Sequence, residues 1–243
     1  MKRDDRQSLI TGNILPTLIS FAFPVLLALF LQAMYGAADL IIVGQFAGTY
    51  EQSGVATGSQ LLHMITMVIT GLTMGVTVFV GHCIGLGDRE RAGQGIGTGI
   101  VIFTMLAVVI TALVVPLSDE LSRLMHAPSE AFAQTSDYIK ICGMGTVFIT
   151  AYNVIGAIFR GIGDSKTPLM TVAIACVINI LGDLFLVAGL GMGAAGAAIA
   201  TVFGQIVAAI MGIVINIKKN KEIHISLKGF RPNGTNIKNI YLV

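Results

Sequence analysis

The amino-acid sequence predicts an all-α integral membrane protein, built as a bundle of six transmembrane helices. Hydrophobic residues make up 54% of the 243 residues and charged residues only 12%, about half the ~25% that is usual in soluble domains. Six apolar runs are long enough to cross a bilayer, and the basic residues between them alternate as a membrane topology requires. A chain with so few charges cannot cover a soluble surface with solvated groups.

Each predicted span contains about 20 or more mainly apolar residues, the length that the ~30 Å hydrocarbon core requires. The six spans are residues 14–43, 55–80, 95–115, 138–159, 168–190 and 193–217. Polar breaks separate them at residues 48–53, 85–91, 118–130 and 161–166, and a tight turn joins the last two spans.

The Lys and Arg residues test this topology, because cytoplasmic loops are enriched in both. If the N-terminus is cytoplasmic, only Arg123 and Lys140 of the 15 basic residues fall on the outer side. We therefore predict a multi-pass protein of a bacterial plasma membrane, with both termini cytoplasmic.

Three segments follow from this topology. Residues 1–13 form the cytoplasmic N-terminus and residues 14–217 form the six-helix transmembrane lobe. Residues 218–243 form a basic cytoplasmic linker. The linker is interpreted either as leading to a missing second lobe or as the tail of a half-size unit that pairs with a second copy.

Two loops on the predicted cytoplasmic side resemble each other, residues 85–88 after the second span and residues 161–164 after the fourth. Each combines glycines with an aspartate, and a basic residue follows. They are either two solvated turns or parts of a gate that closes on ion pairs with the other half.

Several motifs fail on context. The run Gly191-Met-Gly193-Ala-Ala-Gly196 matches the dinucleotide fingerprint, but it joins two apolar helices and not a strand and a helix. The three cysteines lack the paired spacing of a disulfide framework or a zinc site, and no nucleophile–base arrangement is suggested. We expect no enzyme, no organic cofactor and no nucleic-acid partner.

Two aspartates lie deep in apolar runs, Asp39 in the first span and Asp183 in the fifth. An aspartate at the centre of a membrane helix costs about 2.5–3.5 kcal/mol on insertion scales, and such acids usually face an ion or substrate path. The structural alternative is that Asp39 extends to the outer interface while Asp183 only pairs with Asn179.

Further oxygen-bearing side chains accompany these acids at helical spacing. They are Gln32, Tyr35, Asn153, Asn179, Thr201 and Gln205. Carboxylate, amide and hydroxyl oxygens suit a hard monovalent cation such as Na⁺. A close pair of carboxylates equally suits storage of a proton, since the two groups then titrate together. Asn153 and Thr201 also have structural explanations, packing in the first case and a bond to the helix's own backbone in the second.

A set of motifs in a fixed order carries a family resemblance. They are Pro24 and Asp39 with Val43-Gly44, the loop at residues 85–88, Asn153 followed by Arg160-Gly-Ile-Gly-Asp-Ser-Lys-Thr-Pro168, Asn179-x3-Asp183, and Gly193-Ala-Ala-Gly-Ala-Ala-x-Ala-Thr201. Together they make the chain resemble the N-terminal six-helix lobe of the multidrug and toxic compound extrusion (MATE) transporters.

This resemblance implies a cation-coupled antiporter, driven by H⁺ or Na⁺, that exports amphipathic and often cationic compounds. It implies a cation site at the residues matching Asp39, Asn153, Asn179, Asp183 and Thr201, with backbone from Ala197. Having both acids resembles the branch of the family whose N-terminal lobe carries two carboxylates. The chain departs from the family in length, because members have twelve helices in two lobes with the drug cavity between them.

Gln32, Tyr35 and Gln205 remain the candidates for the substrate cavity. The expected partners are a small-molecule substrate, the lipid bilayer and a second lobe. Two alternatives stay open: a flippase for lipid-linked saccharides from the same superfamily, and a non-transporting half that assembles with or regulates a full-length partner. The spans contain almost no basic residues to bind phosphate, which disfavours the flippase.

Pro24 lies inside the first span, where its ring and missing N–H disturb a helix, and it predicts a hinge. We hypothesise that protonation of Asp39 changes the bend of this span. Spin labels at the two ends of the span would report the bend at low and high pH. An interlabel distance that does not change between the two pH values would contradict the hypothesis.

Overall fold

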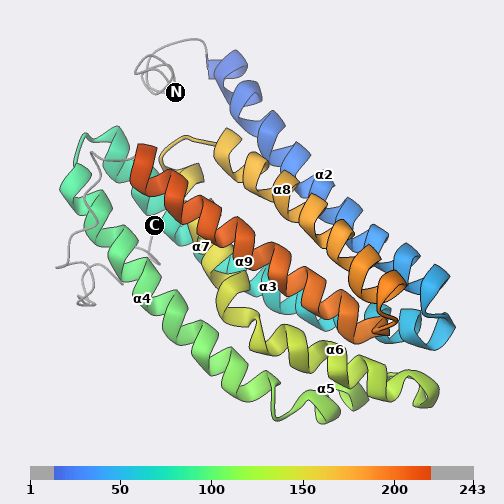
Figure 1. Cartoon of the computed structure of the whole chain (residues 1–243). Helices are drawn as coiled ribbons and strands as arrows, with labels where there is room; N and C mark the ends of the chain where they lie inside the picture. The colour runs from blue at the N-terminus through green and yellow to red at the C-terminus, as the bar shows by residue number, and fades with distance from the viewer. Residues whose placement is uncertain (1–13, 220–243) are drawn as a thin grey trace.

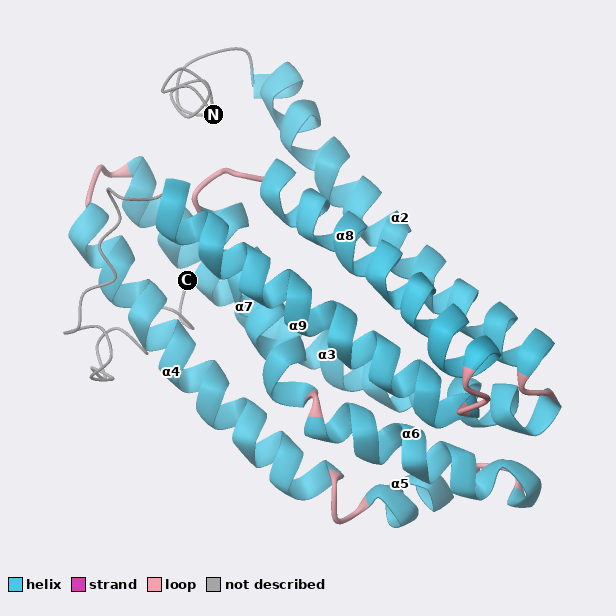
Figure 2. Ribbon diagram, in the orientation of Figure 1, coloured by secondary structure: helices cyan, strands magenta, loops and turns pink. Residues whose placement is uncertain are grey.

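The computed structural model describes residues 14–219, and all regular structure in that range is helical (Figure 2). The elements are α2 (Ile14–Phe46), α3 (Thr49–Gly85), α4 (Arg89–Val114), α5 (Ser118–Leu124), η1 (Ser129–Ala131), α6 (Phe132–Met144), α7 (Thr146–Gly161), α8 (Lys166–Asp183), η2 (Leu184–Gly189) and α9 (Gly193–Lys219). The predicted N-terminal segment 1–13 and residues 220–243 of the predicted linker lie outside the described residues.

The long helices run along one common direction and form an elongated bundle (Figure 1). Helix α2 begins, and helix α9 finishes, at the end of the bundle that also carries the α3–α4 and α7–α8 loops. We call this the basic end, because Arg89 and Arg91 lie in the first turn of α4, Lys166 begins α8 and Lys218 lies in the last turn of α9. The α2–α3 and α8–α9 connections lie at the opposite end (Figure 1).

Five helices within residues 14–219 are each long and apolar enough to cross a membrane, namely α2, α3, α4, α8 with η2, and α9. The prediction of a membrane-spanning helical bundle is confirmed. Helix α2 extends to Phe46 and α3 begins at Thr49, so the break expected at residues 48–53 is only a short turn.

The fourth predicted span needs correction, because residues 138–159 do not form one straight helix. Helix α7 and the segment Ser129–Met144 make a pair bent by 55°. The bend lies at Gly145, where a Cβ would overlap the side chain of Val202 on α9. The expected break at residues 118–130 also contains a short helix, α5.

The two similar loops at the basic end fold identically. In each, the aspartate N–H bonds to a carbonyl five residues earlier, at 2.9 Å for Asp88 and 2.8 Å for Asp164. The preceding glycines have φ angles of 77° and 80°, the left-handed conformation that glycine adopts without strain. Each aspartate then caps the next helix by accepting an N–H three residues later, at 3.0 Å in both loops. These local bonds support the interpretation as turns.

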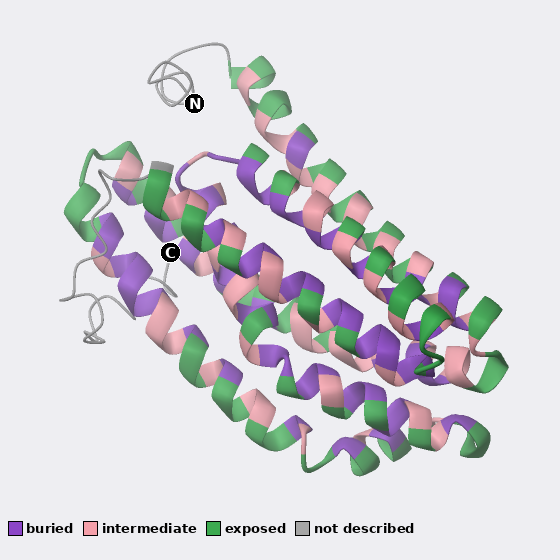
Figure 3. Cartoon of the chain, viewed as in Figure 1, coloured by how far each residue is buried: buried purple, intermediate pink, exposed green. Residues whose placement is uncertain are grey.

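Burial follows the bundle geometry (Figure 3). One core cluster joins α3, α4 and α7 around Val80 and Phe103, and a second joins α2, α3, α6 and α9 around Val43 and Ala197. Large apolar side chains cover the outside, most densely on α2. Only 6% of the most apolar 18-residue stretch of that helix is buried inside the bundle. An apolar exterior of this kind is what a lipid environment accepts.

Helix α9 is anchored at the end opposite the basic end by a side chain from α3. Glu51 Oε2 accepts the backbone N–H of Ala194 at 2.7 Å, in the first turn of α9. A Cβ on Gly193 would overlap this carboxylate, and Gly193 has a φ of 55°. A carboxylate at a helix N-terminus also meets the positive end of the helix dipole.

We predict that Glu51→Ala lowers the free energy of unfolding by about 1.5 kcal/mol, since it removes a charge-assisted hydrogen bond. The midpoint of thermal unfolding should fall by about 3–6 °C. A thiol-reactive dye can follow unfolding in detergent, because Cys83, Cys142 and Cys176 are buried free thiols. Glu130→Ala is the control at an exposed acid. Equal midpoints for the two variants would refute the anchor.

Candidate functional site

Two carboxyl groups meet inside the bundle. Asp39 comes from α2 and Asp183 from the last residue of α8, and their side chains interact directly. Asp39 is 3% exposed and Asp183 is fully buried. The two acids that the sequence places deep in apolar spans are therefore neighbours in the structure.

A third helix joins this pair through Thr201 of α9. The Thr201 hydroxyl donates to Asp39 Oδ2 at 3.2 Å, and Asn179 Nδ2 donates to Thr201 Oγ1 at 3.3 Å. Asn179 and Asp183 share one face of α8, as their spacing predicts. The chain Asn179–Thr201–Asp39 thus links α8, α9 and α2.

Small residues allow α8 and α9 to approach closely enough for these bonds. A Cβ on Gly182 would lie 2.9 Å from the Cβ of Ala200, and one on Gly204 would lie 3.1 Å from the Ala175 carbonyl oxygen. Small residues at helix contacts are the usual way for membrane helices to pack tightly. Both glycines lie within three residues of a polar residue of the site.

Four buried oxygens of this cluster accept no hydrogen bond from the described part of the chain. They are Asp39 Oδ1, Asn179 Oδ1 and both oxygens of Asp183. Burying a carboxylate without a donor is costly unless it holds a proton or a cation. These carboxylate and amide oxygens form a donor set that fits H⁺ or Na⁺.

Tyr138 of α6 is a member of the site that the sequence analysis missed. It is 2% exposed, and its hydroxyl interacts with Thr201 and lies beside Asp39. Gly58 of α3 makes room for the ring, since a Cβ there would lie 2.7 Å from Tyr138 Cδ1. A weak signal was available, because a tyrosine buried in an apolar span usually finds a hydrogen-bond partner.

The helix changes its winding directly after Asp183. Residues Leu184–Gly189 form a π-helix, whose Val187 is buried in the core. A π-helical turn adds a residue per turn and is common at functional sites. Here the change leads from the acid at the end of α8 to the turn before α9, and nothing in the sequence analysis anticipates it.

The candidate substrate residues lie one to two helical turns away from Asp39 and Thr201, toward the basic end. Gln205 Nε2 donates to Tyr35 Oη at 3.3 Å, and the Gln32 side chain also interacts with Tyr35. Gln205 Oε1 is buried and accepts no bond within residues 14–219. The structure therefore brings Gln32, Tyr35 and Gln205 together next to the acid pair.

Comparison with known proteins identifies the family. The MatE family model matches residues 24–185, a segment that contains both acids. This chain belongs to the MATE family. It is 31% identical over 208 residues to the probable multidrug resistance protein YpnP of Bacillus subtilis, covering 85% of the chain and 46% of that relative.

Two further comparisons agree with this assignment. The probable multidrug resistance protein NorM of Thermotoga maritima is 29% identical over 220 residues, which is 88% of this chain and 47% of that protein. A crystal structure of MATE in the bent conformation superposes with a TM-score of 0.90 at 26% identity, covering 99% of this chain and 53% of that one. The chain spans about half the length of the relatives that it matches.

Two residues implied by the MATE resemblance lie apart from the hydrogen-bonded set. Asn153 Oδ1 accepts from Thr70 of α3 at 3.1 Å, and its Nδ2 donates to the Ile149 carbonyl at 2.8 Å. Both ends of the amide are thus used, Oδ1 in joining α7 to α3 and Nδ2 within α7 itself. Ala197 is buried one turn before Thr201, within the apolar cluster. Their contributions to a cation site remain predictions.

Pro24 is buried within α2, and the helix continues through it from Ile14 to Phe46. The structure therefore places the predicted hinge in the first third of the helix that carries Asp39. Its bending remains a prediction.

We predict that Asp183→Asn raises the free energy of unfolding by about 1.5 kcal/mol, because the amide donates to Asp39 and removes a like charge. The midpoint of thermal unfolding should rise by about 3–6 °C at neutral pH in sodium-free buffer. Asp137→Asn, at an exposed position on α6, is the matched control and should leave the midpoint unchanged. A lower midpoint for Asp183→Asn would show that the carboxyl has a donor after all.

Proposed function

We propose that this chain is the N-terminal half of a cation-coupled antiporter that exports amphipathic, often cationic compounds by alternating access. The carrying observation is the Asp39–Asp183 pair, buried between α2 and α8 with three carboxylate oxygens that accept no hydrogen bond from residues 14–219. Membership of the MATE family and the multidrug names of the relatives support the proposal.

The acid pair supplies the coupling. In a low-dielectric interior two adjacent carboxylates strongly favour a bound cation, because each repels the other's charge. A proton or Na⁺ that enters the pair neutralises it and weakens its attraction for a cationic drug nearby. Release of the ion restores the attraction, so that ion and drug bind alternately at one site, which is the requirement for antiport.

The drug would contact the polar group next to the acids. Tyr35 offers an aromatic surface one turn from Asp39, and Gln205 offers an amide oxygen that accepts no bond from residues 14–219, one turn from Thr201. An aromatic ring attracts an organic cation through its π-face. Substrate and coupling ion therefore act on neighbouring side chains of α2 and α9.

The second lobe and the membrane orientation complete the proposal. Because the chain spans about half of each relative, the other wall of the drug path comes from a second lobe. The basic end would face the cytoplasm, since Arg89, Arg91 and Lys166 gather there and cytoplasmic loops carry such residues. The location would be the plasma membrane of a bacterial cell.

We predict that Asp39→Asn reduces ethidium efflux from drug-sensitive bacterial cells by about tenfold or more, since the pair loses one of its two charges. The chain is expressed alone and joined to a second lobe from a full-length relative, at matched membrane levels. Asp137→Asn is the control and should export normally. Efflux that survives Asp39→Asn would contradict carboxylate coupling, and efflux from neither form would favour the flippase or the non-transporting half.

A further inference from the structure

Two side chains of α9 face two side chains of α2 at the same spacing. Thr201 and Gln205 lie four residues apart on α9 and share one face of that helix, and Tyr35 and Asp39 are spaced in the same way on α2. The Thr201 hydroxyl donates to Asp39 Oδ2 at 3.2 Å. One turn nearer the basic end, Gln205 Nε2 donates to Tyr35 Oη at 3.3 Å. The four residues thus form two hydrogen-bonded levels, separated by one helical turn of about 5.4 Å.

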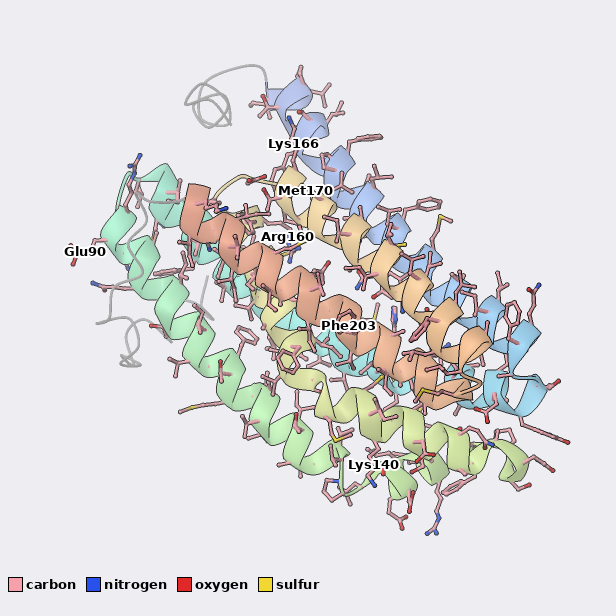
Figure 4. The ribbon with its side chains drawn as sticks, viewed as in Figure 1. Glu90, Lys140, Arg160, Lys166, Met170 and Phe203 are labelled. Carbon is pink, nitrogen blue, oxygen red and sulfur yellow. The ribbon has the colours of Figure 1, made fainter. Side chains whose placement is uncertain are left out.

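Both levels lie inside the bundle and away from its ends. Phe203 comes between Thr201 and Gln205 in α9, and Figure 4 shows it between Lys166 at the basic end and Lys140 toward the opposite end. The Phe203 side chain is exposed on the apolar outside, whereas Thr201 and Gln205 are 8% and 6% exposed. The polar face of α9 is therefore turned inward, toward α2.

The amide of Gln205 has one bonded end and one unbonded end. Its Nε2 is bonded to Tyr35, while its Oε1 is buried and accepts no hydrogen bond from any residue between 14 and 219. A buried acceptor without a donor raises the free energy of the folded protein. A donor that a bound molecule brings to this oxygen is therefore worth more than one brought to an exposed oxygen.

The packing of α9 on α8 keeps Gln205 in this position. A Cβ on the preceding residue, Gly204, would lie 3.1 Å from the Ala175 carbonyl oxygen and 3.6 Å from Asn179 Cβ. The two helices thus approach each other closely, directly beside the site. A rotation of α9 that turned the amide away from α2 would have to break this contact.

The second level adds charge to this arrangement. Asp39 Oδ1 also accepts no hydrogen bond from the described residues, and it belongs to a carboxyl group one turn from the Gln205 level. A cation whose charge lies on N–H groups offers its charge to Asp39 and a donor to Gln205 Oε1. A quaternary ammonium ion, whose charge is surrounded by carbon, offers the charge alone.

We propose that Gln205 selects cationic compounds that carry N–H groups over similar cations that lack them. This inference rests on the proposed function and narrows the substrate class of the same site. A site with a buried hydrogen-bonding group rejects an analogue without the matching group far more strongly than an apolar wall does. The ring of Tyr35 attracts both kinds of cation, so the selection falls to the amide oxygen.

Two fluorescent dyes with the same ring system test this selection. Rhodamine 123 carries its charge on amino groups, and tetramethylrhodamine methyl ester has N-methyl groups in place of their hydrogens. The purified 243-residue chain is titrated into each dye, and fluorescence anisotropy gives the two dissociation constants. Gln205→Met keeps the length of the side chain but removes the acceptor. It should weaken rhodamine 123 binding by about tenfold, the effect of one hydrogen bond to a buried group, and leave binding of the methylated dye nearly unchanged.

Matched variants make the result specific. Gln205→Leu also lacks an acceptor and should reproduce the effect, so the comparison does not depend on the folding of one protein. Gln94→Met replaces a glutamine that bonds to Glu90 on α4, at the basic end, and should leave both dissociation constants unchanged. The thermal midpoint of each variant checks that it is folded.

The proposal is overturned if the folded Gln205 variants lose affinity for both dyes equally, if they lose affinity for neither, or if the wild type does not bind rhodamine 123. The outcome is separable from that of the proposed function. Asp39-dependent ethidium efflux together with an equal loss of both dyes would refute only the selection for N–H groups. A dye preference that depends on Gln205, in a chain that exports no drug, would refute only the drug export.

Discussion

The side chains of Asp39 and Asp183 are buried against each other in helices that cross a membrane. Buried carboxyl groups need hydrogen-bond donors, and the surrounding residues supply only part of them. Thr201 supplies one donor to Asp39, while neither oxygen of Asp183 accepts a bond from the described residues. Folding must therefore offset a large unfavourable term at this point. A protein keeps such a free-energy cost where its function uses the buried charge. Binding of a proton or a cation by the two carboxyl groups would remove this cost.

The rest of the lobe holds this pair in place by close helix contacts. Glycines lie where α8 meets α9 and where α3 meets Tyr138, and in each case a Cβ would come within 3.1 Å of the neighbour. Glu51 fixes the first turn of α9 from α3. Since lipid gives apolar helices no hydrophobic reason to associate, close packing and hydrogen bonds carry the association.

Charge is graded along the interior. Carboxyl groups lie toward the end opposite the basic end, amide and phenol groups follow, and the Arg160 guanidinium lies nearest the basic end. The gradient gives the lobe a direction that its pattern of apolar spans lacks.

Much of the fold follows from hydropathy alone. The apolar runs predict the long helices, because a span must satisfy its backbone internally and shield it with apolar side chains. The grouping of Asn179 with Asp183 likewise follows from helical spacing, since residues four apart share a face whatever the tertiary structure. The bend at Gly145 could not be predicted, because the side chain packed against that glycine, Val202, comes from a helix more than 50 residues later.

The sequence by itself determined the class of protein, the approximate spans and which two acids lie deep in apolar runs, because each depends on composition or on the local period of a helix. Only the tertiary structure decided that Asp39 meets Asp183, that Tyr138 joins them and that the amide of Asn153 is used for packing. It also decided that Arg160 turns inward beside Gly156. These facts depend on how separate helices cross, and no helical period encodes the rotation of one helix against another.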